Sequence, residues 1–246
     1  MSFEDRIRAI ANDREHGSSV LVDRICAEFR ALQSEENAEH RLRWAFHQLR
    51  QIDASMVVVH HLLDTLEPHV GSDFFAELAA YESRWQHIDQ AIANKLLAHR
   101  DFSGNTVITH SHSGILARVI RLLAGRVKGL QVCQTRSEPG GEGELQYREL
   151  QKAGLDVRLV NDADLPELAS ETDTAFLGTD QYNNDYFVNK IGSRRIVESM
   201  QALGKPTFVL GDSRKKVEDL KFSTNLFEKT PFGAGVILVT ESGFGH

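Results

Sequence analysis

The feature that most constrains this chain is a change of hydrophobic period after its first hundred residues. From Thr106 onward, short apolar runs alternate with amphipathic stretches, whereas residues 1–100 show helical spacing alone. Strand–helix alternation with short connections is typical of a parallel sheet covered by helices. The sequence therefore predicts an α/β protein with an N-terminal helical domain, residues 1–103, followed by a Rossmann-like, doubly wound parallel sheet domain, residues 104–246.

The first domain is expected to consist of helices only. Apolar residues recur there at helical spacing, and Pro68 is the only proline before residue 100. The expected helices cover residues 7–11, 20–29, 36–51, 55–66 and 74–97.

The second domain is expected to form a parallel sheet whose strands alternate with helices. The expected strands are 106–110, 130–133, 157–160, 174–178, 207–210 and 236–240. The expected helices between them are 115–123, 143–153, 165–170 and 191–203. In such sheets ligands bind beyond the carboxyl ends of the strands, so the residues directly after each strand are the candidates for a site.

The charge balance argues against a nucleic-acid partner. The chain has 28 Lys and Arg against 35 Asp and Glu, a formal net charge of -7. Affinity for a phosphate backbone comes from clustered basic residues. The run Arg214-Lys215-Lys216 is too short to form such a face, and we interpret it as solvated surface.

Two further features of the sequence indicate a cytoplasmic protein without a membrane partner. Cys26 and Cys133 lie far apart and form neither a disulfide framework nor a metal-spaced cluster, as expected in a reducing compartment. The N-terminal MSFEDRIRAI lacks the apolar core of a signal peptide, and no window approaches the ~18 apolar residues of a membrane span.

Two loops after the expected strands contain residues suited to an anion. The segment 109–114, T-H-S-H-S-G, opens a helix, where free backbone N–H groups and the helix dipole attract negative charge. Ser111 or Ser113 acting as an ordinary N-cap is the alternative. Three glycines within residues 140–143 permit close approach of the backbone to a ligand, although a flexible surface turn would look the same.

Asp180 follows the fourth expected strand and is the candidate acid or base. Desolvation at that position raises the pKa of a carboxyl group, although a lone Asp there can equally be a loop hydrogen-bond acceptor. Lys190 adds positive charge just before an expected helix. The chain has no G-x-x-x-x-G-K-[ST] motif, which argues against a nucleotide triphosphatase. The residues alone thus indicate a crevice suited to a phosphorylated ligand.

Taken in order, several segments resemble a family that contains methylthioribose-1-phosphate isomerase, ribose-1,5-bisphosphate isomerase and the alpha, beta and delta subunits of translation initiation factor 2B. In the sheet domain, residues 109–113 look like the family pattern T-H-C-N-[ST], and residues 136–143 look like E-S-R-P-x-x-x-G. Residues 178–180 together with 189–192 look like G-A-[DE]…N-K-I-G, and residues 230–243 look like the closing T-P…[TV]-E-x-G. In the helical domain, residues 50–56 look like R-P-x-x-A-[SN]-M, and Gly17-Ser18 look like the family's turn after the first helix. The resemblance covers nearly the whole chain.

The resemblance implies the roles of individual residues. The family's isomerases interconvert an aldose 1-phosphate and a ketose 1-phosphate without a metal or an organic cofactor, and their catalytic pair corresponds to Ser111 and Asp180. The substrate- and phosphate-binding residues implied are Gly17, Ser18, Arg50, Ser113, Gly114, Arg136, Asn189 and Lys190.

The chain departs from the enzymes in three respects. Ser111 stands where they have a cysteine, and a hydroxyl is far less acidic than a thiol. The acidic and basic positions of E-S-R-P are exchanged between Arg136 and Glu138, and the stretch from Asp180 to Asn189 is one residue shorter than usual. Asp180 itself agrees with the isomerases rather than with many factor subunits.

Two functions are therefore expected. The leading hypothesis is a protein that binds a phosphorylated sugar or a related small anion between its domains, with isomerisation of that ligand left open by Ser111. The alternative is a non-catalytic regulatory or assembly protein of the factor-subunit type. Because relatives pair through the sheet domain, a homodimer is expected by analogy.

Overall fold

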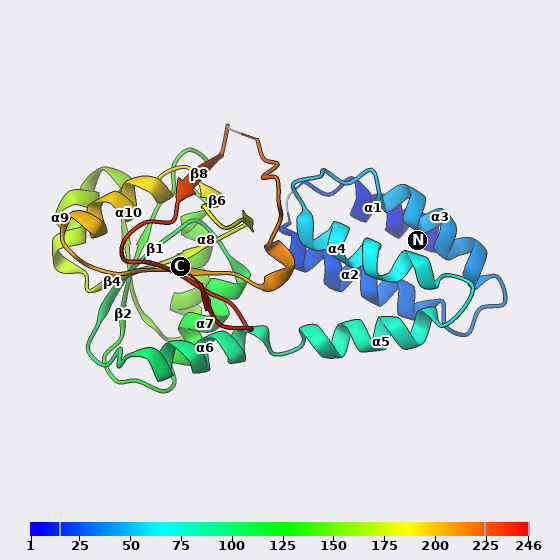
Figure 1. Ribbon diagram of the computed structural model, residues 1–246, viewed down its shortest axis with the longest axis horizontal. Helices are drawn as coiled ribbons and strands as arrows, with labels where there is room; N and C mark the ends of the chain where they lie inside the picture. Colours follow the sequence, from blue (N-terminus) through cyan, green and yellow to red (C-terminus); the bar gives the residue numbers. More distant parts are fainter. Residues whose placement is uncertain (15, 224, 246) are drawn as a thin grey trace. The chain divides into compact units, whose positions relative to one another are not determined.

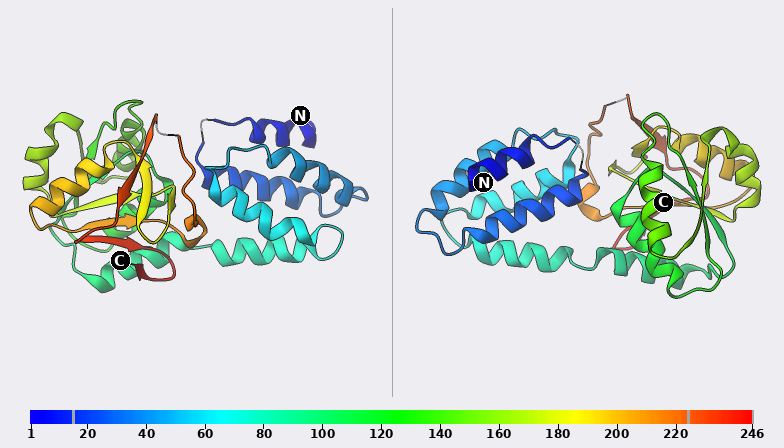
Figure 2. Two further views of the ribbon diagram at one scale, coloured as in Figure 1. Left: turned by 45° about the horizontal axis from the view of Figure 1, so that its top comes forward. Right: turned by 180° about the vertical axis from the view of Figure 1, so that it is seen from behind.

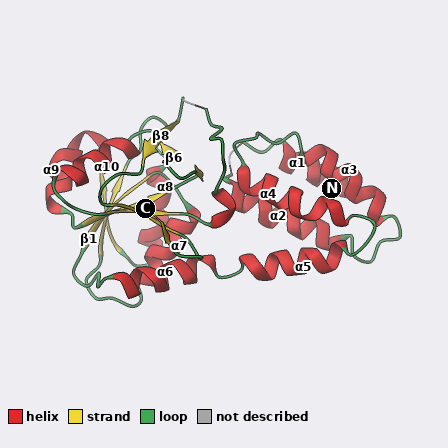
Figure 3. Ribbon diagram, in the orientation of Figure 1, coloured by secondary structure: helices red, strands yellow, loops and turns green. Residues whose placement is uncertain are grey.

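The computed structural model describes residues 1–14, 16–223 and 225–245 (Figures 1 and 3). It divides into two compact units, Met1–Gln86 and His87–His246. The boundary between these units, after Gln86, lies earlier in the chain than the domain boundary expected from the sequence, which falls between residues 103 and 104. None of the helices in the described residues combines the length and the apolar character needed to cross a membrane.

The first unit is helical, as predicted. Its elements are α1 (Phe3–Ala11), α2 (Ser18–Ala31), α3 (Ala38–Leu49), α4 (Val57–Leu66), the short 3-10 helix η1 (Glu67–His69) and α5 (Phe74–Trp85). Three buried rings, Phe29, Phe46 and Phe74, pack with centroids 5.1 to 6.0 Å apart and join α2, α3 and α5. Tilted and edge-on ring packing of this kind adds to the stabilisation from apolar burial.

The prediction of one helix over residues 74–97 is wrong. The structure has two helices there, α5 and α6 (Ile88–His99), because the backbone of His87 adopts the left-handed conformation with a φ of 63°. A left-handed residue cannot continue a right-handed helix. Helix α6 packs against α7 in the second unit, whereas α5 contacts α2 and α4, so the helical period continues across the boundary between the units.

The second unit is built on a seven-stranded sheet of order β10-β9-β7-β4-β1-β2-β3. Its strands are β1 (Thr106–His110), β2 (Gln131–Thr135), β3 (Asp156–Val160), β4 (Thr174–Gly178), β7 (Thr207–Leu210), β9 (Val236–Val239) and β10 (Phe244–Gly245). Adjacent strands are parallel except for β10, which pairs antiparallel with β9. The predicted parallel sheet is therefore confirmed.

Helices cover both faces of this sheet, as a doubly wound fold requires. Figure 2 shows α6, α7 (Gly114–Ala124) and α8 (Gly143–Lys152) on one face, with α9 (Leu165–Glu171) and α10 (Ser193–Ala202) on the other. The buried rings of Phe102, Phe176 and Phe208 pack together with centroids 5.4 to 6.0 Å apart.

The order of the strands places a topological switch point between β1 and β4. From β1 the chain adds β2 and β3 on one side, and it then crosses over to add β4, β7 and β9 on the other. At the carboxyl ends of the two central strands, His110 lies opposite Leu177. Ligands of doubly wound sheets bind at such a point, so the segments after β1 and β4 are in the expected position for a site.

A second, smaller sheet was not predicted. It contains β5 (Gln181–Tyr182), β6 (Tyr186–Lys190) and β8 (Phe227–Pro231) in the antiparallel order β5-β6-β8. Two further 3-10 helices, η2 (Asp162–Asp164) and η3 (Ser213–Lys215), follow β3 and β7. The segment between Asp180 and Lys190 is thus a hairpin, and Asn189 and Lys190 lie on a strand.

The left-handed backbone at His87 generates a stability prediction. Because a β-branched side chain is strained in that conformation, His87→Val should lower the free energy of unfolding by about 1–2 kcal/mol. Gln86→Val is the matched control, since the neighbouring exposed Gln86 has an extended backbone (φ -69°, ψ 144°) that valine adopts readily. Urea denaturation measures the free energy of unfolding of both variants. An equal decrease in the two would contradict the left-handed backbone conformation of His87.

Candidate functional site

Loops that follow β1, β4 and β7 meet at the carboxyl edge of the sheet. A Cβ atom on Gly178, at the end of β4, would lie 2.9 Å from the Oγ of Ser113 in the loop after β1. A Cβ on Gly211, directly after β7, would lie 2.6 Å from the Cγ2 of Thr179. Both separations are too short for real atoms, so glycine at 178 and 211 allows these loops to come into contact.

Ser111 occupies a sharp turn between β1 and α7. Its φ is 67°, an uncommon value for a residue with a side chain. Its backbone N–H donates to the Oγ of Ser137 over 2.6 Å, and its own Oγ donates to the Oε1 of Glu142 over 3.3 Å. Ser113, in contrast, is the N-cap of α7 and accepts from the N–H of Leu116. The capping alternative therefore holds for Ser113.

His110 ties the ends of neighbouring strands together. Its buried ring lies 2.7 Å from the carbonyl oxygen of Ile191 through Nε2 and 2.6 Å from the hydroxyl of Thr135 through Nδ1. Because a carbonyl only accepts, Nε2 carries the hydrogen and Nδ1 accepts from the hydroxyl. Burial lowers the pKa of His110, in accord with a neutral ring. Exposed His112 lies 3.3 Å from a carboxylate oxygen of Glu149.

The glycine-rich segment after β2 folds closely over Lys190. The Nζ of Lys190 is buried, lies 2.7 Å from the Oε1 of Glu142 and donates to the carbonyl of Pro139. Gly140 has a φ of 111°, and a Cβ there would lie 2.8 Å from the Oε2 of Glu142. The glycine thus serves a close approach rather than a free surface turn.

Asn189 contributes to the start of α10. Its Nδ2 donates to the Oγ of Ser193 over 2.9 Å, and that hydroxyl donates to the carbonyl of Lys190. The N–H groups of Gly192 and Arg194 donate to one carboxylate oxygen of Glu228, at 2.8 and 2.9 Å. The N-terminus of α10 therefore already has an anionic partner from the protein.

Asp180 has the properties of an acid or base. Its side chain is open to solvent, yet protein surrounds it densely enough that desolvation raises its pKa, with a further increase from Glu142 and an opposing decrease from Lys215. Its backbone N–H donates to Val188. Within the described residues its carboxyl group makes no hydrogen bond, so it is available to a ligand.

The interpretation of Arg214-Lys215-Lys216 as solvated surface is wrong for two of its three residues. Arg214 and Lys215 are 8% and 7% exposed, and only Lys216 is an exposed side chain. The Nζ of Lys215 donates to the carbonyl of Thr179 over 2.6 Å, next to Asp180. A signal was present in the sequence, because this run lies in the loop that follows an expected strand, as the other candidate segments do.

Lys215 is a buried cation without a carboxylate partner. In the parts of the chain that the structure describes, three Lys or Arg side chains are buried. Lys190 pairs with Glu142 at 2.7 Å and Arg214 with Asp212 at 2.9 Å, but no carboxylate lies at ion-pair distance from Lys215. Buried charges are normally paired. Lys215 therefore marks a position where a ligand anion would be stabilised.

The ion pair beside Lys215 is held firmly in its charged form. Burial acts to raise the pKa of Asp212, but Arg214 and Lys215 outweigh that effect and lower it. The Asp212 carboxylate also accepts from the backbone N–H of Arg214 over 3.1 Å. Arg214 is thereby neutralised, whereas Lys215 acts on Asp180 and Asp212 only from beyond ion-pair distance in the described residues.

The predicted residues of the first unit have partners within that unit. Gly17 is the N-cap of α2 and Ser18 its first residue. Arg50 ends α3, and its guanidinium pairs with Asp64 at 2.5 Å and with Glu67 at 2.6 Å. A role for Gly17, Ser18 and Arg50 in the same site as Asp180 stays a prediction.

Arg136 and Glu138, the positions with exchanged charge, lie at the edge of the same loop. The guanidinium of Arg136 pairs with Glu144 and donates to Asn161 over 3.1 Å. The backbone N–H of Glu138 donates to the carboxylate of Asp162 over 2.6 Å. A phosphate-binding role for Arg136 stays a prediction.

One group of side chains in the described residues has the composition of a metal site. His69, Asp73 and Glu77 in the first unit bring three possible ligand atoms within 4.8 Å of one another. The Nδ1 of His69 lies 2.8 Å from the Oδ1 of Asp73, and both side chains are partly exposed. A surface hydrogen bond accounts for this contact.

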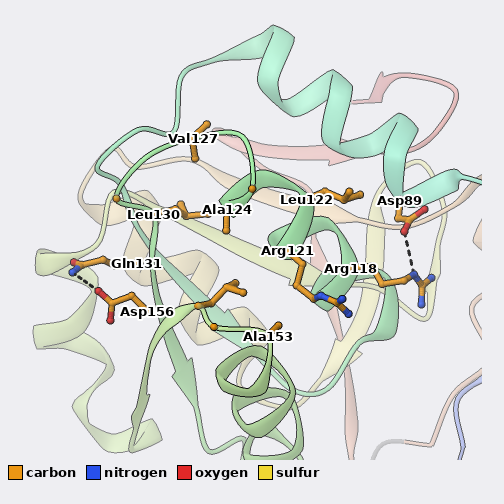
Figure 4. A pocket seen from close by; sticks show the side chains of 14 residues that line it. Asp89, Arg118, Arg121, Leu122, Ala124, Val127, Leu130, Gln131, Ala153 and Asp156 are labelled. Atoms are coloured by element: carbon orange, nitrogen blue, oxygen red, sulfur yellow. Dashed lines mark hydrogen bonds and ion pairs between the residues drawn. The ribbon is translucent and has the colours of Figure 1, made fainter.

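A cleft of 720 Å³ lies at the opposite, amino edge of the sheet, by the starts of β2 and β3 (Figure 4). Leu122, Leu130 and Leu155 line it, and at its rim Arg118 pairs with Asp89 at 3.4 Å. None of the strand-end residues described above lines this cleft. The chemistry of the carboxyl edge, rather than the size of a cleft, therefore identifies the candidate site.

Comparisons with known proteins agree with the fold and with the motifs. The model of the initiation factor 2 subunit family matches residues 7–237. A Pyrococcus horikoshii protein described as translation initiation factor eIF-2B subunit 2-like is 27% identical over 221 residues, which cover 87% of this chain and 79% of that protein. Ribose 1,5-bisphosphate isomerase of Archaeoglobus fulgidus is 25% identical over 212 residues, which cover 83% of this chain and 64% of the isomerase.

Solved structures show the same fold. The crystal structure of Pyrococcus horikoshii translation initiation factor eIF-2B has a TM-score of 0.81 and 23% identity, covering 99% of this chain and 96% of that one. The 5-methylthioribose 1-phosphate isomerase of the same organism has a TM-score of 0.78 and 16% identity, covering 99% and 84%. With its family model matched over nearly its whole length, the chain belongs to the initiation factor 2 subunit family.

Proposed function

We propose that this protein binds a phosphorylated sugar at the carboxyl edge of its parallel sheet. The observation that carries the proposal is Lys215, a buried ammonium group that has no carboxylate at ion-pair distance and lies next to the solvent-accessible Asp180. An ammonium group in such surroundings strongly favours an anionic ligand, because the charge is poorly solvated without one.

The start of α7 supports a phosphate as that anion. In the described chain the backbone N–H groups of Gly114 and Ile115 have no protein acceptor, since Ser113 caps only the N–H of Leu116. Free N–H groups at the N-terminus of a helix bind phosphate oxygens favourably. We infer that Gly17, Ser18 and Arg50 of the helical unit complete the site, which requires Arg50 to leave its carboxylate partners.

The leading reaction is the interconversion of an aldose 1-phosphate and a ketose 1-phosphate. In this isomerisation a hydrogen moves from C2 to C1, the hydroxyl on C2 loses its proton, and the ring oxygen gains one as the ring opens. One group must accept a proton and another must supply one. Asp180, whose pKa is raised, suits one of these steps, and Ser111, whose hydroxyl contacts Glu142, is our candidate for the other.

A non-catalytic role is favoured by a different observation. The hydroxyl of Ser111 donates its hydrogen to Glu142, so that hydrogen is not directed at a ligand. A hydroxyl is also too weak an acid to transfer a proton readily. On this alternative the protein keeps the anion site as a regulatory pocket and acts through assembly. A homodimer remains our expectation for its assembly.

Replacing Lys215 tests the anion site. Lys215→Met keeps the buried aliphatic chain but removes the charge, and it should weaken binding of ribose 1-phosphate by about 10- to 100-fold, the usual worth of a hydrogen bond to a charged group. Isothermal titration calorimetry measures the change. Lys216→Met, at the exposed neighbouring position, is the control and should bind as the wild type does. Equal affinities for the two variants would remove the basis of the proposal.

Replacing Asp180 separates the two functions. If the protein is an isomerase, Asp180→Asn should lower turnover of an aldose 1-phosphate by about 100-fold or more while the sugar still binds, because a general acid or base contributes about that much. Proton NMR of a panel of aldose 1-phosphates follows the product. Turnover by the variant at the wild-type rate would rule out Asp180 as the acid or base, and absence of turnover in the wild type would favour the regulatory alternative.

The pKa of Asp180 also predicts a pH dependence of stability. Because the pKa in the folded protein lies above the ordinary value of 3.8, the folded protein binds more protons than the unfolded chain between the two values. Wild-type stability therefore falls as the pH rises through that range, and Asp180→Asn should remove this loss. Urea unfolding from pH 4 upward measures it, with Asp219→Asn at an exposed position as the control. Parallel curves for the two variants would contradict the prediction.

A further inference from the structure

Glu142 holds a central place among the charges of the candidate site. Its Oε1 lies 2.7 Å from the Nζ of Lys190 and accepts from the hydroxyl of Ser111 over 3.3 Å. Its charge also acts on Asp180, whose pKa it raises. One carboxylate thus interacts with three residues that the motifs place in the site, although its own position in the motif is a variable one.

The backbone on both sides of Glu142 fixes its position. Gly140 leaves room for the carboxylate and the ammonium group, since a Cβ there would lie 2.8 Å from the Oε2 of Glu142 and 3.2 Å from the Nζ of Lys190. Gly143 begins α8 directly against β2, because a Cβ there would lie 1.9 Å from the carbonyl oxygen of Thr135. The side chain of Glu142 is 27% exposed and that of Lys190 only 2%, so the carboxylate is the more accessible partner.

This ion pair determines how much positive charge the site offers. Lys190 is neutralised by Glu142, and Arg214 is neutralised by Asp212. Of the buried cations in the described residues, Lys215 alone has no carboxylate at ion-pair distance. On this view a ligand with one phosphate would pair with Lys215. A second anionic group near Lys190 would be repelled by the carboxylate of Glu142, which already pairs with Lys190.

We propose that Glu142 is a specificity-determining residue that restricts the site to sugar monophosphates by occupying Lys190. The ligand class is an aldose phosphate with one anionic group and an uncharged remainder. Specificity of this kind arises from repulsion of the wrong ligand as much as from attraction of the right one. The inference rests on the proposed function, because it names the ligands that the same site accepts and rejects.

The test compares ribose 1-phosphate with ribose 1,5-bisphosphate by calorimetry on the full chain. Wild-type protein should bind the monophosphate more tightly. Glu142→Gln keeps the shape of the side chain but frees the charge of Lys190, so it should shift the affinity ratio toward the bisphosphate by about tenfold or more, as expected for removing one like charge at close range. Glu171→Gln, an exposed position on α9, is the control and should keep the wild-type ratio.

A double variant guards against an effect on folding alone. Glu142→Gln leaves Lys190 buried without its partner, which can destabilise the protein. Glu142→Gln combined with Lys190→Met removes both charges, and the gain for the bisphosphate should disappear because it depends on the freed ammonium group. Thermal melts of each variant establish that the folded protein is being compared.

The outcomes separate the two proposals. Binding of the monophosphate with an unchanged ratio in Glu142→Gln would overturn the role of Glu142 and leave the proposed function standing. A wild-type preference for the bisphosphate would also overturn the role of Glu142. Failure of the wild type to bind either sugar would overturn the proposed function and, with it, this inference.

Discussion

Burying positive charge at the carboxyl edge of the sheet is the constraint on which the candidate site depends. Lys190, Arg214 and Lys215 are each less than a tenth exposed. A buried cation is tolerated only when an anion or several acceptors lie close to it. Glu142 and Asp212 meet this need for two of the three, and the carbonyl of Thr179 meets it only in part for Lys215. The strand-end loops are arranged around these pairs, and the unmet need of Lys215 is the basis on which we propose that this edge binds an anion.

The parallel core of the fold could be predicted because its strands are short runs of apolar and β-branched residues that alternate with amphipathic stretches. Residues 106–110, 174–178 and 207–210 were predicted with the bounds that the structure has. The small antiparallel sheet could not be, because a two-residue strand such as Gln181–Tyr182 and a polar strand such as Phe227–Pro231 have no hydrophobic period to detect. The break between α5 and α6 at His87 could not be predicted either, because there the helical period gives no sign of an end. Apolar residues continue at helical spacing through it, and only the backbone conformation interrupts the helix.

Position along a strand predicts which residues lie near the carboxyl edge. Ser111 and Asp180 come just after β1 and β4, so the rule for parallel sheets assigns both to that edge from sequence alone, and their roles there stay predictions. Lys215 and Glu142 were missed because their significance lies in burial and pairing, which a count of charges does not reveal. A run of three basic residues normally faces solvent. Here Gly211 brings the loop against Thr179, and Lys215 is buried as a result. The contributions of Gly17, Ser18 and Arg50 remain predictions.

Glu142 couples the two properties on which a function at this edge would depend. The same negative charge that neutralises Lys190 also adds to the rise in the pKa of Asp180, of which desolvation is the main cause. On our proposal, one side chain therefore influences both ligand choice and proton affinity. A neutral residue at position 142 would leave a second cation in the site and, at the same time, make Asp180 a stronger acid. The two effects cannot be adjusted independently by changes at this position. For the isomerisation that we propose, a chain with serine at position 111 has no acidic thiol as a second proton donor, so the proton affinity of Asp180, to which Glu142 contributes, matters more.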